Sequence, residues 1–204
     1  IGWPVNAATL EQFGGGFAVA DNSAAWAAAM ASLPAQGGTL TLGCGTYRTA
    51  SGLAQSSYVE IDGCGGEGAT VIDCAGIVAT VPCISSTGYG FRINGVLIVA
   101  PSGPAIAVSN AAFAEIEDVG VQDTRAADAN VWGHSCITLA NVWESSLKDI
   151  RLVNCRTFGL SVSGYNTTLV ASRVYASSPV KSCIMLNGLT YAHFDTPACD
   201  SPGD

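Results

Sequence analysis

Short apolar segments recur at nearly constant intervals down the second half of this chain, and this repeat constrains its fold more than any other feature. One series of strand starts recurs about every 22 to 31 residues, an interval typical of solenoids. Two further series follow the same steps, so each repeat holds three strand segments in one register. The first series contains Ile84, Ile106, Ile137, Leu160 and Ile184; the second contains Ile93, Ile116, Leu147, Leu169 and Phe194; the third contains Ile98, Val121, Leu152, Val174 and Cys199. The repeat predicts an all-β chain that winds as a right-handed parallel β-helix with these columns inside.

The first fifty residues follow a different pattern. The stretch 24–33 predicts a short amphipathic α-helix with Trp26, Met30 and Leu33 on its buried face, and residues 39–42 predict the first strand. The terminal coil of a solenoid exposes apolar side chains, so we expect this helix to cap it. We therefore expect an N-terminal segment, residues 1–50, followed by β-helix coils over residues 51–204. The third column still continues at Cys199, so we expect further coils beyond the given chain or cover by another chain.

Composition limits the function classes. Charged residues make up 12% of the chain and the formal net charge is −8. Binding to a phosphate backbone needs a basic surface, so nucleic acid is not an expected partner. No apolar run approaches the ~18 residues of a membrane span, so we expect no membrane insertion. No phosphate-binding loop or metalloprotease motif is present, and we expect no cofactor.

The chain has eight cysteines. Cys83, Cys136 and Cys183 hold equivalent positions in the repeat, and the nearest two lie two strand spacings, roughly 10 Å, apart, so they cannot pair with one another. We predict free, buried thiols, as in a protein assembled in a reducing cytosol, with a bridge between Cys64 and Cys74 as the alternative. No pair has Cys-x-x-Cys spacing, and we expect no metal site.

Four motifs near the N-terminus carry a family resemblance. They are Phe13-Gly14-Gly15, the stretch from Asp21 to Trp26, the stretch from Gly37 to Leu42, and Gly45-Thr46-Tyr47-Arg48. Together they resemble the opening of pectate-lyase-like right-handed β-helix proteins, most of all bacteriophage tailspikes and capsule depolymerases. The Gly-Asp-Gly that usually precedes the cap is absent. The resemblance implies a homotrimer in a virion tail, assembled in the host cytoplasm with other phage tail proteins. It also implies outer faces that bind and often cleave bacterial surface polysaccharide, commonly with Asp and Glu as acid and base.

One loop interrupts the repeat between Val121 and Cys136, where it carries about eight extra residues. It includes Asp123, Arg125, Trp132 and His134. A tryptophan among polar side chains can stack on a sugar ring, so these residues are candidates for substrate binding. The alternative is a loop whose tryptophan packs as a lid or on a neighbouring chain.

Carboxylates on successive coils form a second candidate site. The alignment places Asp118 beside Asp149 at about one strand spacing, ~4.8 Å, and two such carboxylates could serve as the acid and base of glycoside cleavage. The same alignment pairs Glu117 with Lys148 as a surface ion pair. The preceding coil has Asn94-Gly95 there, so the alternative is a turn that favours Asp for backbone reasons.

Two further features are weaker candidates. Arg151 and Arg173 are predicted to lie on neighbouring coils, where they could bind the carboxylate of an acidic sugar or form salt bridges instead. Glu144 lies beside a tryptophan. The sequence Asn166-Thr167-Thr168 matches a glycosylation acceptor, which free thiols would argue against.

Three functions remain open from the sequence. The first is a phage tailspike segment that binds and degrades bacterial surface polysaccharide. The second is a non-catalytic adhesin or structural spike on the same scaffold. The third is a secreted polysaccharide lyase or hydrolase, which disulfides would favour.

Overall fold

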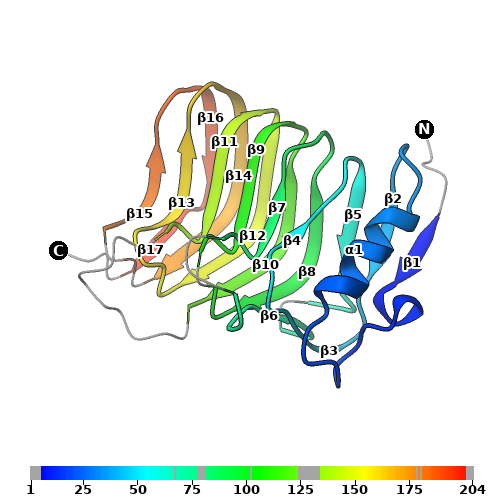
Figure 1. The fold of residues 1–204 in the computed structure, drawn as a ribbon. Helices are drawn as coiled ribbons and strands as arrows, with labels where there is room; N and C mark the ends of the chain where they lie inside the picture. The colour runs from blue at the N-terminus through cyan, green and yellow to red at the C-terminus, as the bar shows by residue number, and fades with distance from the viewer. Residues whose placement is uncertain are drawn as a thin grey trace.

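The computed structural model describes residues 6–66, 68–77, 81–101, 103–123, 134–177, 179 and 181–200. The described strands form two parallel sheets, joined in alternation by the chain (Figure 1). The larger sheet contains β1 (Ala7–Thr9), β2 (Gly38–Thr41), β3 (Gly45–Arg48), β5 (Val59–Asp62), β6 (Thr70–Asp73), β8 (Arg92–Val99), β10 (Glu115–Gln122), β12 (Ser145–Val153), β14 (Asn166–Ser177), β16 (Leu189–Asp195) and β17 (Ala198–Asp200). The smaller contains β4 (Leu53–Ala54), β7 (Ile84–Ser86), β9 (Ile106–Ala112), β11 (Ile137–Trp143), β13 (Phe158–Ser163) and β15 (Ser182–Leu186).

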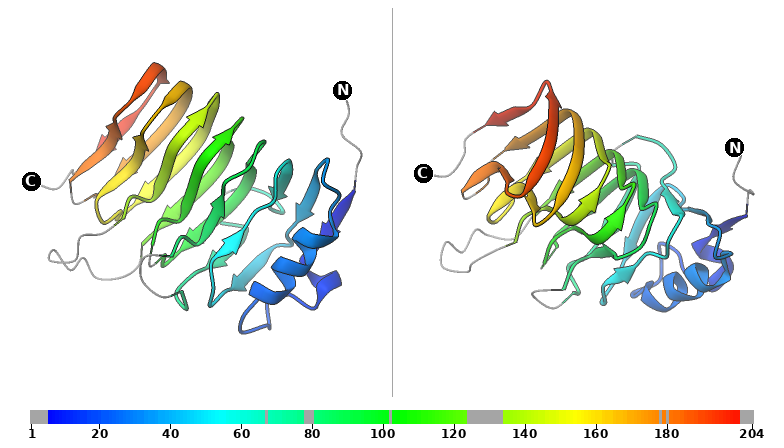
Figure 2. Two further views of the ribbon diagram at one scale, coloured as in Figure 1. Left: turned by 45° about the horizontal axis from the view of Figure 1, so that its top comes forward. Right: turned by 90° about the horizontal axis from the view of Figure 1, so that it is seen from above.

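Each strand pairs with its counterpart one coil further on. The order β8-β10-β12-β14-β16 in one sheet is matched by β7-β9-β11-β13-β15 in the other. A chain that alternates between two sheets in this way winds as a solenoid, and the stacked coils are visible in three orientations (Figures 1 and 2). The predicted parallel solenoid is therefore confirmed, while its right-handed winding stays a prediction.

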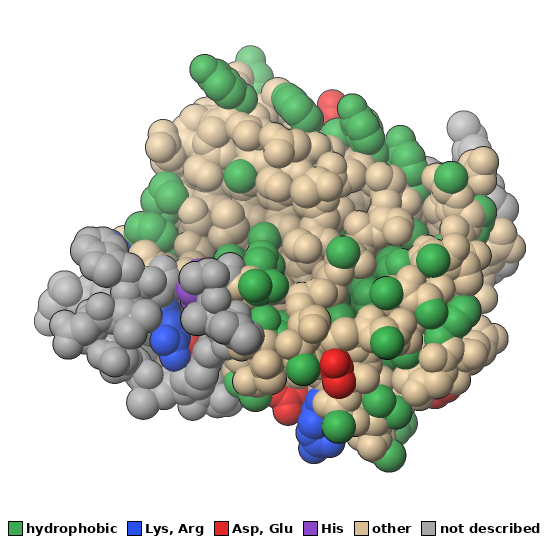
Figure 3. Space-filling view, in the orientation of Figure 1, with side chains coloured by type: hydrophobic (Ala, Val, Ile, Leu, Met, Phe, Trp, Pro, Cys, Tyr) green, Lys and Arg blue, Asp and Glu red, His purple; other side chains and the backbone are tan. Residues whose placement is uncertain are grey.

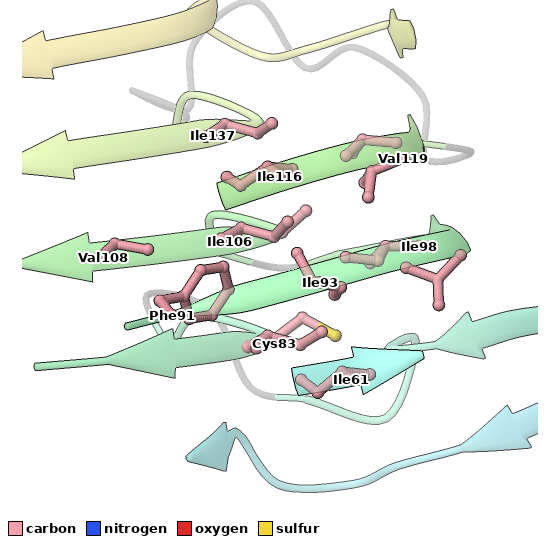
Figure 4. Packing of buried hydrophobic residues seen from close by; sticks show 14 of the residues in the cluster. Ile61, Cys83, Phe91, Ile93, Ile98, Ile106, Val108, Ile116, Val119 and Ile137 are labelled. Carbon is pink, nitrogen blue, oxygen red and sulfur yellow. The ribbon is translucent and has the colours of Figure 1, made fainter. Parts of the chain in front are cut away.

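The first predicted column is confirmed in full. Ile84 lies opposite Ile106, Ile106 opposite Ile137, and the series continues through Leu160 to Ile184. All of these side chains are buried except Ile184, which is partly buried. Figure 4 shows Ile106 and Ile137 stacked on adjacent coils, with Ile93 and Ile116 beside them.

The other two predicted columns hold over three coils and then shift by two residues in β14. Ala171, and not Leu169, lies opposite Leu147, and Ala176, and not Val174, lies opposite Leu152. A shift of two residues keeps the same face of a strand inward, so apolar alternation cannot distinguish the two registers. Both sets of side chains are buried.

The long strands of the larger sheet bend at one residue in each coil. The bends have left-handed backbone angles: Gly95 (φ 66°), Asp118 (50°), Asp149 (54°), Arg173 (52°) and, just after β16, Thr196 (50°). The second and third predicted strand segments are therefore continuous in β8, β10, β12 and β14, where each strand turns a corner.

A single α-helix among the described residues, α1 (Ser23–Ser32), packs against the first coil, next to the 3₁₀ helix η1 (Leu10–Phe13). Trp26 and Met30 are buried as predicted, and the indole Nε1 of Trp26 donates a hydrogen bond to the carbonyl oxygen of Ala54 (2.9 Å). Leu33, at the C-cap, is partly buried. The helix thus covers apolar side chains at the N-terminal end of the solenoid.

The prediction of free thiols is wrong. All eight cysteines form disulfides: Cys44–Cys64, Cys74–Cys83, Cys136–Cys155 and Cys183–Cys199. The suggested alternative bridge between Cys64 and Cys74 is also wrong, because each of these residues has another partner.

The reason for the error is geometric. Cys83, Cys136 and Cys183 indeed do not pair with one another, as expected from their spacing along the column. Each instead pairs with a cysteine at the third strand segment of a coil: Cys74 and Cys155 follow that segment, and Cys199 lies within β17. The Cα–Cα distances in these three bridges are 5.4 to 5.9 Å. The bonding partners of these three cysteines therefore lie outside the first column.

Candidate functional site

The outer face of the larger sheet carries two columns of polar side chains. Because side chains alternate along a strand, the residues between the buried isoleucines point outward. In the first column Arg92 of β8 lies between Glu60 of β5 and Glu115 of β10. The second column, parallel to it, contains Asp62, Asn94, Glu117 and Lys148. The solenoid therefore places carboxylates from different coils side by side.

A shallow groove follows these columns. A hollow of about 80 Å³ is lined by Glu60, Arg92, Glu115 and Glu117, among others. A larger hollow of about 380 Å³ shares Glu115 and is also lined by Phe113 and Glu144. We call these two neighbouring hollows together the acidic groove and define it by six residues: Glu60, Arg92, Phe113, Glu115, Glu117 and Glu144.

Glu60 has the most acid-like environment in the groove. Partial burial raises the pKa of its carboxyl, and the nearby charges of Asp62 and Glu115 raise it further, while Arg92 opposes the shift. Desolvation and like charges both disfavour the ionised form. Glu60 is thus suited to hold a proton above the pH at which most glutamates lose theirs.

Glu115 is held in a defined position by Arg92. The guanidinium donates from Nε and Nη2 to the two carboxylate oxygens, at 3.0 and 3.3 Å. Such two-point contacts fix orientation as well as charge. Next to this pair, Lys148 contacts Glu117, which confirms the predicted surface ion pair, and Asn94 donates to Asp62 (3.1 Å).

Aromatic side chains line the edge of the solenoid beside the groove. They lie where the chain passes from the smaller sheet to the larger one, in the connections or, for Trp143, at the last residue of β11. One occurs in each of five successive coils: Tyr58, Tyr89, Phe113, Trp143 and Tyr165, with 38, 52, 49, 41 and 86% of their surface exposed. Tyr58 and Tyr89 are stacked, with ring centroids 6.4 Å apart. The space-filling view shows hydrophobic side chains projecting in a row along this upper edge (Figure 3). We call these five residues the aromatic rim.

The predicted Asp118 and Asp149 hold equivalent positions on adjacent coils. Their neighbours pair directly, and both have left-handed backbone angles, as Gly95 does one coil earlier. The turn interpretation of these positions is therefore confirmed. Arg173 pairs with Asp149 and holds the pKa of that carboxyl below its usual range, mainly through hydrogen bonding. Asp149 is thus poorly suited to act as the proton donor, and a catalytic role for the two residues stays a prediction.

The predicted alignment of Arg151 with Arg173 is wrong. Arg151 lies opposite Tyr175, while Arg173 sits at the bend and forms a two-point ion pair with Asp149. The reason is again the two-residue shift of β14. Arg173 forms the salt bridge given as the alternative, and binding of an acidic sugar by Arg151 and Arg173 stays a prediction.

The insertion between β10 and β11 is described only at its two ends. Arg125 and Trp132 lie outside the described residues. Asp123 is 3% exposed and accepts a hydrogen bond from Nε of Arg156 (2.8 Å), so it serves as an anchor for the start of the insertion. His134, at the other end, is partly buried. Binding of substrate by these four residues stays a prediction.

The possible glycosylation acceptor is part of the core. Asn166 is 4% exposed, its Oδ1 accepts from the backbone N–H of Val142 and its Nδ2 donates to Ser163, both at 2.8 Å. An amide used in this way is not available for modification in the folded protein.

Neither a metal-binding cluster nor a membrane-spanning helix is found among the described residues. No group of three or more His, Cys, Asp or Glu side chains in this part of the chain is arranged to hold a metal ion. No helix within it is long and apolar enough to cross a membrane.

Sequence reasoning missed Glu60, Arg92 and Glu115. The repeat was recognised from Cys83 onward, so Glu60 in the preceding coil was not aligned with the others. The signal was present: the stretches Val59-Glu60-Ile61 and Phe91-Arg92-Ile93 share one alternating pattern.

Comparison with known proteins supports the fold. A protein from Parabacteroides merdae ATCC 43184, provisionally described as a glycosyl hydrolase, has 16% identity over 95% of this chain and 97% of that chain, with a TM-score of 0.67. ORF18 of Geobacillus virus E2 has 12% identity over 96% of this chain and 61% of that chain, with a TM-score of 0.51. At such identities the similarity shows a shared fold. No family model and no curated protein sequence matches the chain.

Proposed function

We propose that this chain belongs to an extracellular protein that hydrolyses a polysaccharide in the acidic groove. The observation that carries the proposal is the column Glu60–Arg92–Glu115, in which a carboxyl with a raised pKa stands two strands away from a carboxylate fixed by an arginine. Glycoside hydrolysis requires one carboxylic acid to protonate the leaving oxygen and a second, ionised carboxylate.

The roles follow from the two environments. Glu60 donates a proton to the glycosidic oxygen, because its raised pKa keeps it protonated at higher pH. Glu115 acts as the base that removes a proton from an attacking water. Arg92 positions Glu115, and the charge of its guanidinium is balanced by that carboxylate, so the surrounding groove remains negative where positive charge develops on the sugar.

The separation of the two residues suggests the stereochemical outcome. Glu60 and Glu115 are two strand spacings apart, about 9–10 Å between their Cα atoms. Inverting enzymes hold their carboxyl groups ~6.5–9.5 Å apart, whereas retaining enzymes need about 5–5.5 Å. Both side chains point outward from one column, so we take the Cα spacing as a guide to the carboxyl separation and propose inversion of the anomeric centre.

The four disulfides favour an oxidising location for the folded chain. They favour a secreted hydrolase over a virion tail protein that is assembled in the host cytoplasm. A phage tailspike or depolymerase remains the second candidate, since the viral protein ORF18 is similar in fold. A homotrimer found by sedimentation equilibrium of the oxidised protein would favour this second candidate, and a monomer would count against it.

The decisive experiment measures reducing ends released from a panel of bacterial and plant polysaccharides. Glu60→Gln and Glu115→Gln should each lower turnover by on the order of a hundredfold or more. Asp195→Asn, in the same outward column as Glu117 but on β16, is the matched control and should keep the wild-type rate.

The same assay compares the proposal with the sequence-based one. Should Asp118→Asn and Asp149→Asn abolish cleavage while both Glu variants remain active, the bend residues are the catalytic pair and our assignment is wrong. Products with retained anomeric configuration in NMR would contradict the predicted inversion.

A further inference from the structure

The aromatic rim places one exposed ring in each of five successive coils, although the rings do not all hold equivalent positions: Trp143 lies opposite Ala112, next to Phe113. Its members recur once per coil, and the coils are spaced by about 4.8 Å along the axis. Polar residues lie close to the rim residues in the sequence: Ser57 precedes Tyr58, Thr87 lies two residues before Tyr89, and Glu144 follows Trp143. Flat apolar faces separated by hydrogen-bonding groups match the two surfaces of a pyranose, which has an apolar face and a polar edge. The length of one sugar in an extended polysaccharide is similar to the coil spacing.

The rim continues into the acidic groove. Phe113 lines the larger hollow, and Glu144 follows Trp143 directly in the chain and lines the same hollow. A chain that follows the rim along the solenoid axis would therefore reach Glu115 without leaving the surface. A protein–protein interface, in contrast, requires about 800 Å² of well-packed surface per partner, and a row one ring wide does not provide it.

The charges beside the rim act against an acidic polymer. The acidic groove contains four glutamates and one arginine, and the whole chain has a net charge of −8. Basic side chains on this part of the molecule are occupied by carboxylates of the protein. The pairs are Arg92 with Glu115, Lys148 with Glu117, and Arg173 with Asp149. An anionic sugar would meet repulsion from the four glutamates, and the three cations named here already face carboxylates of the protein.

We propose that the aromatic rim and the acidic groove together bind an uncharged polysaccharide that lies along the solenoid axis, with its sugar rings stacked on the rim. This inference rests on the proposed function and names its substrate class. It does not depend on cleavage, because stacking and charge determine binding whether or not Glu60 and Glu115 perform the chemistry.

The test is affinity electrophoresis of the oxidised protein in gels that contain one polymer each. The neutral panel is hydroxyethyl cellulose, xylan, glucomannan, dextran and laminarin, and the anionic panel is alginate and polygalacturonate. We expect retardation by at least one neutral polymer and by neither anionic one. Asp195→Asn protein, whose substitution lies outside the acidic groove, is run in parallel and should give the same ranking as wild type.

Ring substitutions test the rim itself. Trp143→Leu keeps an apolar side chain but loses the flat ring, and should weaken binding about fivefold to tenfold. Trp143→Phe restores a ring and should recover most of it. Tyr165→Leu, in the most exposed rim position, should also weaken binding while leaving the thermal unfolding midpoint within a degree or two of wild type.

Several results would overturn the inference. They are tightest binding to an anionic polymer, no binding to any neutral polymer, or equal binding by Trp143→Leu and wild type. A change of mass in sedimentation velocity on Trp143→Leu would instead make the rim an interface between copies. If wild-type protein cleaves an anionic polymer and the Glu variants do not, the proposed hydrolysis stands. Only the assignment of an uncharged substrate is then refuted.

Discussion

Replacement of Ile137 by Ala should reveal how much the central column contributes to stability. Ile137 is fully buried between Ile106 and Leu160 on the adjacent coils. The substitution removes three carbon groups at about 0.8 kcal/mol each, so about 2.4 kcal/mol of transfer free energy is lost. The cavity left behind adds to this, because stacked strands cannot collapse into it freely, and we expect a total loss of about 3–4 kcal/mol, within the ~2–5 kcal/mol typical of buried Ile→Ala changes.

Ile184→Ala is the matched control. It changes the same side chain in the same column, but Ile184 is only partly buried. We expect its loss to be less than half that of Ile137→Ala. Urea unfolding of the oxidised proteins, followed by tryptophan fluorescence and far-ultraviolet circular dichroism, gives both free energies, provided that the two probes coincide. Equal losses at the two positions, or a loss below about 1 kcal/mol at Ile137, would show that the column does not carry the fold. Ile137→Asp, which buries an unpaired charge, should prevent folding of several coils.

Three further predictions address other parts of the molecule. If Glu60 is the acid, turnover should decline as pH rises through its raised pKa, above the ordinary value of 4.5, and any stability gained from its protonation should be lost over the same range; a pH–rate profile without an alkaline limb would exclude this role. Denatured, unreduced protein should show no reactive thiol in a colorimetric titration, and a count near eight would contradict the disulfides. Trp132→Ala should weaken glycan binding with an unchanged melting temperature, as measured by calorimetry; a lowered melting temperature with unchanged binding would favour the alternative in which the ring packs as a lid.

Much of the fold could be predicted because each coil of a solenoid repeats the same apolar pattern in the sequence. The column from Ile84 to Ile184 was readable since each coil places one large apolar residue at the same position. The register of β14 was not, because Ala171 and Ala176 are smaller than the apolar neighbours that compete with them in the pattern. The disulfides were missed because they join a cysteine of the first column to one at the third strand segment. The spacing of cysteines within one column does not predict the distance between two columns.

The candidate site was less accessible to sequence reasoning. The bend at Asp118 and Asp149 was found by alignment, but the partner of Asp149 depends on the exact register of β14, which placed Arg173 beside it. The importance of Glu60 depends on its partial burial and on charges that come from Asp62 on the same strand and from Arg92 and Glu115 on the next two coils, far away in sequence. A site built from side chains of different coils can therefore be identified only when the register of the coils is known.

The disulfides also determine how this chain would respond to tension. Each encloses a short loop, with sequence separations of 20, 9, 19 and 16 residues. A pulled chain gains roughly 3.3–3.6 Å per released residue, but residues inside a closed loop release nothing. When coils unfold from either end, the residues between two bridged cysteines add no length to the chain. The oxidised protein should therefore extend to a shorter final length than the reduced one. Reduction of the four bridges should therefore lengthen the fully extended chain by the residues that the closed loops hold back.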